Sequence, residues 1–450
     1  MKPKPNILFI IADDHRHNAI RSLGDPTVQT PILDGLVASG TALRQNHIMG
    51  SLSGAVCIPT RACLHTGAHL FQAGTSTEIS NHRGIMTLNP DLTLMAENFR
   101  AEGYHTFATG KWHNDRASFN RSFADGSTIF FGGMSDHDRV PLHDYSPSGQ
   151  YWDDDCTIGD GFSSEIFSDS AIQFLNKYDG DDPFFLYLAF TAPHDPRTPP
   201  PAYAALYDPE EIPLPPNYLP EHPFDNGELD NRDENLAPFP RPEEIVRQHI
   251  ADYYGMISHM DAQIGRVLQA LADNGYLENS IVVYTADHGL AVGQHGLFGK
   301  QNLYDHSIRV PLILNGPGVP SGKQIDGLTH TNDIYPTLCE LTQVSIPATV
   351  ESESLLPLLQ GEQATFRNYV CSAYKYIQRS ISDGEWKLIR YYHSQESQTG
   401  EERVQLFQIA HDPWEMNDLS ADVSQQERVQ ALSEHLTTWM VSVGDPLISH

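Results

Sequence analysis

Five short apolar runs recur along the chain and have the length of buried strands. They combine β-branched, aromatic and aliphatic residues without strict alternation, which is typical of strands that are covered on both faces. We therefore expect strands at residues 6–12, 105–109, 183–190, 280–286 and 310–315.

Between these runs, apolar residues recur at the three- and four-residue spacing of amphipathic helices. The clearest example spans residues 250–271, and Gly275 is a natural C-terminal stop for it. Alternating strands and helices predict an α/β fold, with a large, mostly parallel sheet flanked by helices.

After about residue 365 the pattern changes to strand-like runs that are separated by turn residues. The pair Asp383-Gly384 between two such runs is a strong hairpin signal. A further strand at 403–409 and an amphipathic helix near 425–442 follow. We expect a main domain at residues 1–364 and a smaller C-terminal α+β subdomain at 365–450, made of antiparallel strands and a helix.

Ionisable side chains follow four of the predicted strands. In open α/β sheets, ligands bind beyond the carboxyl ends of the strands, so these side chains should gather at one edge. Each alone would be an ordinary loop residue, but together they indicate a functional site. They are Asp13 and Asp14 after the first strand, Lys111 and His113 after the second, His194 after the third, and Asp287 and His288 after the fourth.

Two long segments, residues 114–160 and 195–247, are rich in Asp, Gly and Ser or in Pro and acidic residues. Long ordered loops in compact domains are commonly functional. We expect both segments to form rims over the site, with mobile surface loops as the alternative.

The stretch SGAVCIPTRACLHTG at residues 53–67 places Cys57 two residues before Pro59 and four before Arg61. Proline is favoured in the first helical turn, so Cys57 should start a short helix that ends at Gly67. Helix N-termini attract anions, and a thiol placed there would be reactive. An ordinary half-buried cysteine on a loop is the alternative interpretation.

Composition and charge exclude several classes of function. The 450 residues are 40% hydrophobic, as in globular proteins, and no apolar run is long enough to span a membrane. The net charge of −30 repels nucleic acid and anionic membranes. Five scattered cysteines form no disulfide framework or zinc spacing. The first apolar run ends in two aspartates rather than a cleavage site, so we expect a cytoplasmic protein, or a periplasmic or secreted one if a signal was removed.

A candidate metal site combines three carboxylates with one imidazole: Asp13, Asp14, Asp287 and His288. Hard oxygen ligands favour Ca²⁺, with Mg²⁺ as the alternative, over zinc. Arg61, Lys111 and Lys300 add positive charge. A metal beside these cations would suit a tetrahedral oxyanion such as sulfate or phosphate.

The chain resembles the type I sulfatases of the alkaline-phosphatase-like superfamily over nearly its whole length. The family's Cys-x-Pro-x-Arg motif, followed by Thr-Gly, stands here as Cys57-Ile58-Pro59-Thr60-Arg61 with Thr66-Gly67. Further matching segments are ADD at 12–14, TGKWH at 109–113, APHDP at 192–196, TADHG at 285–289, GQHGLFGK at 293–300, RVPLIL at 309–314 and LFQIAHDPWEMNDL at 406–419.

The resemblance implies a sulfuric ester hydrolase whose catalytic domain is residues 1–364. It implies that a maturation enzyme oxidises Cys57 to formylglycine, whose hydrated aldehyde attacks sulfur and later releases sulfate through its second hydroxyl. Many family members have Asn where His288 stands. The implied ligands of one Ca²⁺ are Asp13, Asp14, Cys57, Asp287 and His288.

The same resemblance implies a role for each of the other residues. Arg61 and Lys111 would hold the diol. His113 would be the base for the elimination. His194 and Lys300 would grip the sulfate and help to protonate the leaving alcohol.

The rim residues indicate a sulfated carbohydrate as substrate. The loop at 132–145 carries His137, Arg139 and His143, which would suit a sugar sulfate with uronic acids or further sulfates. Stabilisation of the loop is the alternative role for these three. Further candidates for the rim are His15, Arg16, His82 and Arg83.

Three other interpretations stay open. One is a phosphonate or phosphate monoester hydrolase with the same formylglycine and metal site. Another is a non-catalytic anion-binding relative, against which the complete set of ionisable residues argues. The third is a metal-dependent phosphatase or mutase with Thr60 as nucleophile, which the Cys-x-Pro-x-Arg frame disfavours.

Overall fold

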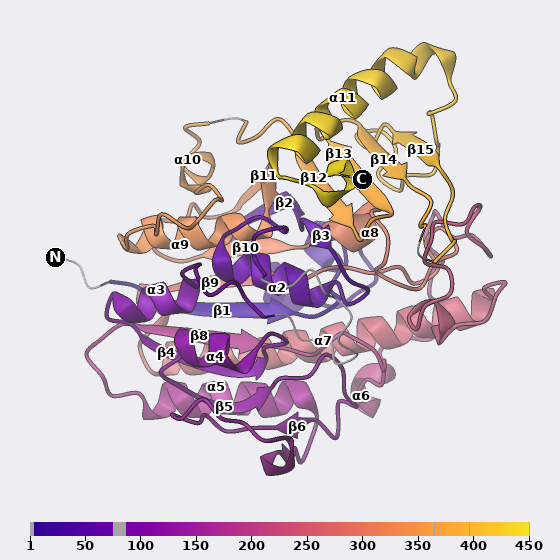
Figure 1. Cartoon of the computed structure of the whole chain (residues 1–450). Coiled ribbons are helices and arrows are strands. Elements are labelled where there is room, and N and C mark those ends of the chain that lie inside the picture. The colour runs from indigo at the N-terminus through magenta and orange to yellow at the C-terminus, as the bar shows by residue number, and fades with distance from the viewer. Residues whose placement is uncertain (1–3, 75–86, 364, 396, 450) are drawn as a thin grey trace.

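An eight-stranded sheet forms the centre of the computed structural model, which describes residues 4–74, 87–363, 365–395 and 397–449 (Figure 1). In order across the sheet, the strands are β11 (Lys323–His330), β2 (Thr41–His47), β10 (Leu312–Asn315), β9 (Ser280–Ala286), β1 (Asn6–Ala12), β8 (Phe184–Ala189), β4 (His105–Lys111) and β5 (Asp125–Phe130). Strand β10 runs antiparallel to both of its neighbours, whereas the other pairs are parallel. The predicted mostly parallel α/β sheet is therefore confirmed.

All five predicted strands lie in this sheet, as β1, β4, β8, β9 and β10. The helices of the described residues, in chain order, are α1 (Pro31–Ser39), α2 (Cys57–Thr66), α3 (Met95–Ala101), α4 (Arg116–Ser122), α5 (Ser163–Lys177), α6 (Pro201–Ala204), α7 (Glu243–Asp273), α8 (Asp305–Ile308), α9 (Ile334–Thr342), α10 (Leu356–Leu359) and α11 (Gln426–Ser442). The helix predicted over 250–271 is part of α7, and Gly275 follows it with a φ of 75°.

Strand β1 shows why the sheet needs helices on both faces. Its seven residues are all buried, and successive side chains of a strand point to opposite faces. Leu8 and Ile10 belong to the core that includes residues of α1, α5 and α7. Ile7 and Phe9 belong to the core that includes residues of α2, α3 and α9. The continuous apolar run of β1 is thus explained by burial on two sides.

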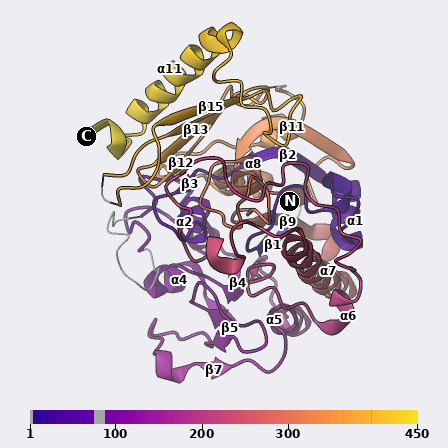
Figure 2. The same cartoon turned by 90° about the vertical axis from the view of Figure 1, so that its right-hand side faces the viewer.

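A second, five-stranded sheet lies in the C-terminal part of the chain. Its order is β15 (Arg403–Phe407), β14 (Lys387–Tyr391), β13 (Gln378–Ser382), β12 (Val370–Tyr374) and β3 (Gly50–Ser51). The predicted antiparallel strands and the hairpin at Asp383-Gly384 are present, and α11 packs over this sheet (Figure 2). However, β3 comes from the N-terminal part of the chain and pairs in parallel with β12. The division at residue 364 stays a prediction.

The two long segments contain more structure than the sequence pattern indicates. Residues 114–160 include α4, the edge strand β5 and a small ribbon of β6 (Pro141–Leu142) and β7 (Thr157–Ile158). Residues 195–247 are mostly irregular and include α6 and the start of α7. Among the described residues, no helix combines the length and the hydropathy needed to cross a bilayer.

Candidate active site

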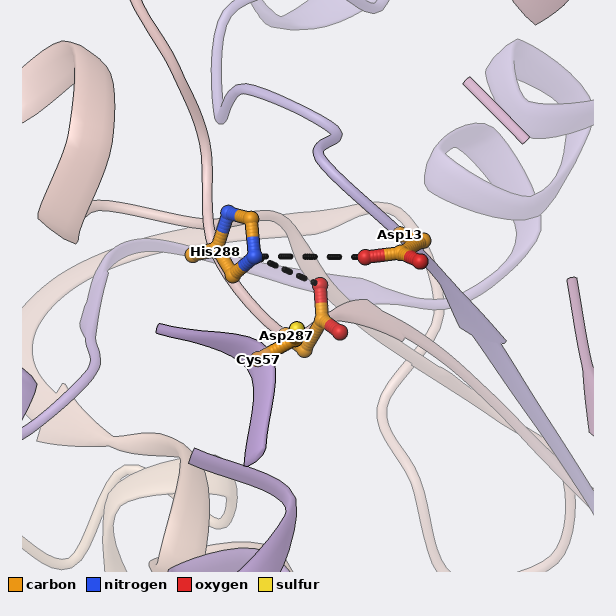
Figure 3. Close-up of side chains that lie close together, drawn as sticks. All are labelled: Asp13, Cys57, Asp287 and His288. Carbon is orange, nitrogen blue, oxygen red and sulfur yellow. Dashed lines mark ion pairs between the residues drawn. The ribbon is translucent and has the colours of Figure 1, made fainter. Parts of the chain in front are cut away.

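The carboxyl ends of the central strands bring a buried cluster of metal-binding groups together. Strand β1 ends at Ala12 and β9 ends at Ala286, and the residues that follow them meet (Figure 3). Ligand atoms of Asp13, Cys57, Asp287 and His288 all lie within 4.8 Å of one another. The Nε2 atom of His288 is 3.9 Å from Asp13 Oδ1 and 3.7 Å from Asp287 Oδ1.

Two atoms of this cluster point to a bound cation. Within the described part of the chain, Asp13 Oδ1 and His288 Nε2 are buried and have no hydrogen-bond partner. Unpaired buried acceptors are costly, and a cation between them would satisfy both. Asp14 Oδ1 lies 3.1 Å from the same imidazole nitrogen. Several carboxylate oxygens and one imidazole are a donor set that fits Ca²⁺ or Mg²⁺.

Three cations balance the buried carboxylates. Arg61 Nε donates to Asp287 Oδ2 at 2.9 Å, Lys111 pairs with Asp13, and Lys300 Nζ donates to Asp14 Oδ1 at 2.9 Å. Burial and Asp287 would raise the pKa of Asp13, but Lys111, His194 and Arg61 hold this pKa below its usual value. The carboxylate therefore stays ionised and available to a metal.

Cys57 is the first residue of α2, as predicted, and it lies beside two of the predicted catalytic residues. Its Sγ is 3.1 Å from His113 Nδ1 and 3.9 Å from Lys111 Nζ. All ten residues of the helix are buried. The thiol is thus buried at the start of a helix and is not half-exposed on a loop.

His113 is held as a neutral imidazole. Burial, together with the neighbouring Lys111, lowers the pKa of His113 well below its usual value. Its backbone has a φ of 58°, in the left-handed region that side chains other than glycine rarely adopt. The chain turns sharply after β4 at this point, and the ring faces Cys57.

His194 and Lys300 form the other side of the site. Lys300 Nζ lies 3.0 Å from His194 Nε2, and the two residues come from loops 106 positions apart. Burial lowers the pKa of Lys300, but Asp14 and Asp233 more than reverse this and raise it well above its usual value. The lysine therefore stays positively charged, as its predicted role in binding an anion requires.

The three predicted rim residues differ in how far they are exposed to solvent. His137 is 1% exposed and lies beneath His194, because its Nε2 is 2.9 Å from the His194 carbonyl oxygen and its Nδ1 is 2.8 Å from Ser163 Oγ. It is therefore not on a solvent-facing rim. Arg139 is exposed, and His143 is half-buried at the edge of a groove.

Two of the four additional rim candidates, His15 and Arg16, lie in the described part of the chain, and both are buried. His15 is fully buried between Tyr284 and the carbonyl of Ala19. Arg16 is buried, with its guanidinium over the Tyr253 ring. His82 and Arg83 lie outside the described residues.

Sequence reasoning missed several residues that shape the site. The carbonyl of Gly133 accepts a 2.6 Å hydrogen bond from Lys111 Nζ, and a Cβ atom on this glycine would lie 2.5 Å from His113 Nε2. Arg232 donates to both carboxylate oxygens of Asp195, at 2.8 and 2.7 Å. Asp195 follows His194 directly, a signal that could have been used, whereas Gly133 and Arg232 lie in irregular segments without periodic pattern.

Comparison with known proteins identifies the family. The sulfatase family model matches residues 5–344, and a model described as N-sulphoglucosamine sulphohydrolase, C-terminal, matches residues 293–442. The chain belongs to the sulfatase family. It is therefore a hydrolase of sulfate esters in the alkaline-phosphatase-like superfamily, as its resemblance predicted.

Individual relatives of this sulfatase cover nearly all of it. An arylsulfatase of Clostridium perfringens is 29% identical and aligns with 96% of this chain and 94% of its own. An N-acetylglucosamine-6-O-sulfatase of Bacteroides thetaiotaomicron is 26% identical, over 96% of this chain and 84% of its own. A solved structure described as a complex with its substrate D-glucosamine-2-N,6-O-disulfate superimposes with a TM-score of 0.81 at 23% identity, covering 98% of both chains.

Proposed function

We propose that this sulfatase removes sulfate from a sulfated carbohydrate, using formylglycine made from Cys57 and a bound Ca²⁺. The observation that carries this proposal is the position of Cys57. Its Sγ lies on the first turn of α2, 3.1 Å from a neutral imidazole and within the cluster of carboxylates. The sulfatase relatives that act on sugar sulfates support the choice of substrate.

Asp13, Asp14, Asp287, His288 and the converted Cys57 would hold the Ca²⁺. The cation would supply a positive charge for the sulfate oxygens. Arg61, Lys111 and Lys300 already neutralise much of the carboxylate charge, because each pairs with one of the three aspartates. The site can therefore accept a dianionic sulfate without a large excess of negative charge.

The side chains beside Cys57 would act in the release of sulfate. The hydrated aldehyde has one hydroxyl to attack sulfur and a second whose deprotonation releases sulfate. His113 Nδ1 faces that position and, being neutral, can accept the proton of the second hydroxyl. Lys111 Nζ, 3.9 Å from Sγ, would stabilise the oxyanion that develops there.

The leaving alcohol would be protonated from the opposite side. His194 Nε2 and Lys300 Nζ lie 3.0 Å apart and face the cluster together. The charged lysine can bind a sulfate oxygen. Its ammonium, which donates to His194 Nε2, would supply the proton that this pair passes to the ester oxygen as the bond from that oxygen to sulfur breaks. Asp195 and the backbone carbonyl beside it fix the other ring nitrogen of His194.

The test is an activity panel on the protein co-expressed with a formylglycine-generating enzyme. We expect hydrolysis of sulfated oligosaccharides and 4-nitrophenyl sulfate, at rates well above those for a phenylphosphonate ester. Cys57→Ala should abolish turnover, whereas Cys63→Ala, which removes a buried thiol from the same helix, should not. Faster hydrolysis of the phosphonate would instead support the phosphonate hydrolase interpretation.

The metal is tested separately. EGTA treatment should abolish turnover and lower the thermal unfolding temperature, because the buried carboxylates lose their cation. Added Ca²⁺ should restore both. Retention of full activity after exhaustive chelation would rule out an essential Ca²⁺.

A further inference from the structure

A groove of about 510 Å³ adjoins the active site, although none of the predicted catalytic or metal-binding residues lines it. The link between them is the turn at residues 132–134. Gly133 packs against His113 and accepts the Lys111 hydrogen bond, whereas its two neighbours, Gly132 and Met134, line the groove. A substrate whose sulfate is held beside His113 would therefore extend its next unit into this groove.

The groove has the surface of a sugar-binding site. Phe131 and Met134 give it an apolar floor, and the half-buried His143 packs its ring against Phe131, with centroids 5.5 Å apart. Met134, which lines the groove, is 49% exposed. Large exposed apolar side chains around a concavity mark a ligand site. A pyranose ring could pack its apolar C–H face on such side chains and direct its hydroxyl groups to the polar residues around them.

The charges of the groove select against an acidic sugar. Of the described residues that line it, Arg116 is the one that is permanently cationic, and it pairs with Asp153. Asp115 adds a carboxylate that accepts hydrogen bonds from the backbone of Ser118 and Leu88. Burial and the nearby Arg116 lower the pKa of His143, so its ring is neutral at pH 7.

A second arginine near the groove, Arg232, also has its charge neutralised by carboxylates. Arg232 contacts the Met134 sulfur, but its guanidinium is shared between Asp195 and Asp233. Neither arginine is thus left with an uncompensated charge for a uronate or a second sulfate. Among the described residues that line the groove, the carboxylates of Asp115 and Asp153 outnumber the single cation Arg116.

We propose that this groove binds an uncharged sugar ring adjoining the sulfated one, so that the preferred substrate is a sulfated oligosaccharide with a neutral neighbouring residue. The inference rests on the proposed function of the site. It differs from the expectation that cationic groups around the pocket receive uronic acids or further sulfates. The neutral ring packs on Phe131 and Met134, and its hydroxyls face Arg116, Asp153 and His143.

The first experiment compares kcat/KM for a monosaccharide sulfate and for two disaccharides that carry the same sulfated unit. One disaccharide has a neutral neighbouring sugar and the other a uronate. We expect the neutral disaccharide to exceed both other substrates by about tenfold, the value of roughly 1.4 kcal/mol of extra binding. A uronate disaccharide that is equal or better would overturn the proposal.

Variants locate the preference in the groove. Met134→Ala should lower the ratio of kcat/KM for the neutral disaccharide over the monosaccharide by about fivefold, through lost apolar contact. Met416→Ala is the matched control, because Met416 is 53% exposed and does not line the groove. Asp153→Asn should release the charge of Arg116 and shift the preference towards the uronate disaccharide. An unchanged ratio in both groove variants would refute the assignment.

Binding without turnover separates this inference from the proposed function. The Cys57→Ala protein is titrated with the unsulfated neutral disaccharide, with ligand-observed NMR as the readout. We expect saturable binding that Met134→Ala weakens and Met416→Ala does not. If this binding occurs but no sulfate ester is hydrolysed, the proposed chemistry fails while the groove assignment stands. If sulfate esters are hydrolysed without such binding, the groove assignment fails.

Discussion

At the scale of single residues, the site depends on backbone turns that few side chains tolerate. Asp14 and His113 both have left-handed backbone conformations, with φ values of 65° and 58°. Each such residue costs about 1–3 kcal/mol, and both lie directly beyond strands of the central sheet. At these two positions the chain turns the Asp14 carboxylate towards His288 and the His113 imidazole towards Cys57. The packed sheet therefore holds Asp14 and His113 in strained backbone conformations that direct their side chains into the site.

Gly133 gives the sharpest prediction at this scale. A methyl group on this residue would meet His113 Nε2 at 2.5 Å, so the ring must turn away from Cys57. We expect Gly133→Ala to lower kcat by at least about a hundredfold, the range typical for loss of a positioned base. Stopped assays on the converted protein measure kcat, and circular dichroism checks the fold.

The control for that variant is Gly35→Ala. Gly35 lies in α1 and a Cβ atom there would meet no atom within 4 Å, so activity should be unchanged. Wild-type kcat in Gly133→Ala would contradict the assigned position of His113.

Residue-scale prediction from sequence succeeded where a rule about strand ends applied. Asp13, Asp287 and His288 were placed together because parallel strands deliver their following residues to one edge. The same reasoning could not find Gly133, whose importance lies in the absence of a side chain. It also could not distinguish His137, which is buried beneath His194, from a rim histidine, because polarity alone does not tell burial.

At the scale of elements, α2 is fixed at both ends. Cys57 begins it, and Gly67 ends it with a left-handed φ of 65° and a hydrogen bond from its N–H to the Cys63 carbonyl. The helix contacts α3, α9 and β3. The C-terminal end of α2 at Gly67 is therefore packed closely against its neighbours. This packing fixes the direction of the helix, and so the direction in which its first turn presents Cys57.

We expect Gly67→Ala to lower the free energy of unfolding by about 2–4 kcal/mol. The left-handed φ costs about 1–2 kcal/mol for alanine, and the added Cβ would lie 2.9 Å from Val350 and 3.0 Å from Tyr335, which adds overpacking. Gly361→Ala measures the cost of the left-handed φ alone, because Gly361 has a φ of 73° and a Cβ atom there would meet nothing within 4 Å. Equal losses in the two variants, measured by urea denaturation, would contradict the tight fit of α2.

The strands of the central sheet that the apolar runs do not predict lie at its edges or next to one. Strands β5 and β11 form the two edges of the sheet, and β2 lies next to β11. Strands at or next to an edge are covered less completely, so they carry exposed polar residues such as Arg44 of β2 and Asp326 of β11, which pair with each other. The apolar runs identify the central strands because burial on both faces demands them.

At the scale of the whole molecule, the segment before Cys57 connects the two sheets. Strand β3 pairs with β12, and α2 begins six residues after it. The active site is therefore built on both sheets, and α8 joins the same region because Asp305 pairs with Lys387 of β14. The sequence pattern predicted each sheet but not this connection, since a two-residue strand leaves no periodic signal.

The buried histidines predict how stability depends on pH. Burial lowers the pKa of six imidazoles to about 4: His15, His47, His69, His137, His222 and His249. These groups are neutral in the folded protein but take up protons in the unfolded chain below its pKa of about 6.5. Above pH 6.5, protonation of these rings therefore does not change the free energy of unfolding. As the pH falls from 6.5 to 4, each ring lowers the free energy of unfolding by about 1.4 kcal/mol per pH unit.

Urea denaturation across pH 4–8 measures this dependence. We expect the free energy of unfolding to be nearly constant above pH 7 and to fall steeply below 6.5. His222→Gln should reduce the number of protons taken up on unfolding at pH 5 by about one. A constant free energy of unfolding from pH 7 down to pH 5 would contradict the buried, neutral state of these rings.

The central claim is that Cys57 is the precursor of the nucleophile, and mass spectrometry of one peptide tests it most directly. Trypsin releases residues 45–61, in which Cys57 is the sole cysteine. After co-expression with a formylglycine-generating enzyme, we predict a peptide with the mass of the aldehyde, which a hydrazide reagent converts to its hydrazone. A peptide that carries only an alkylatable thiol under the same conditions would contradict the account.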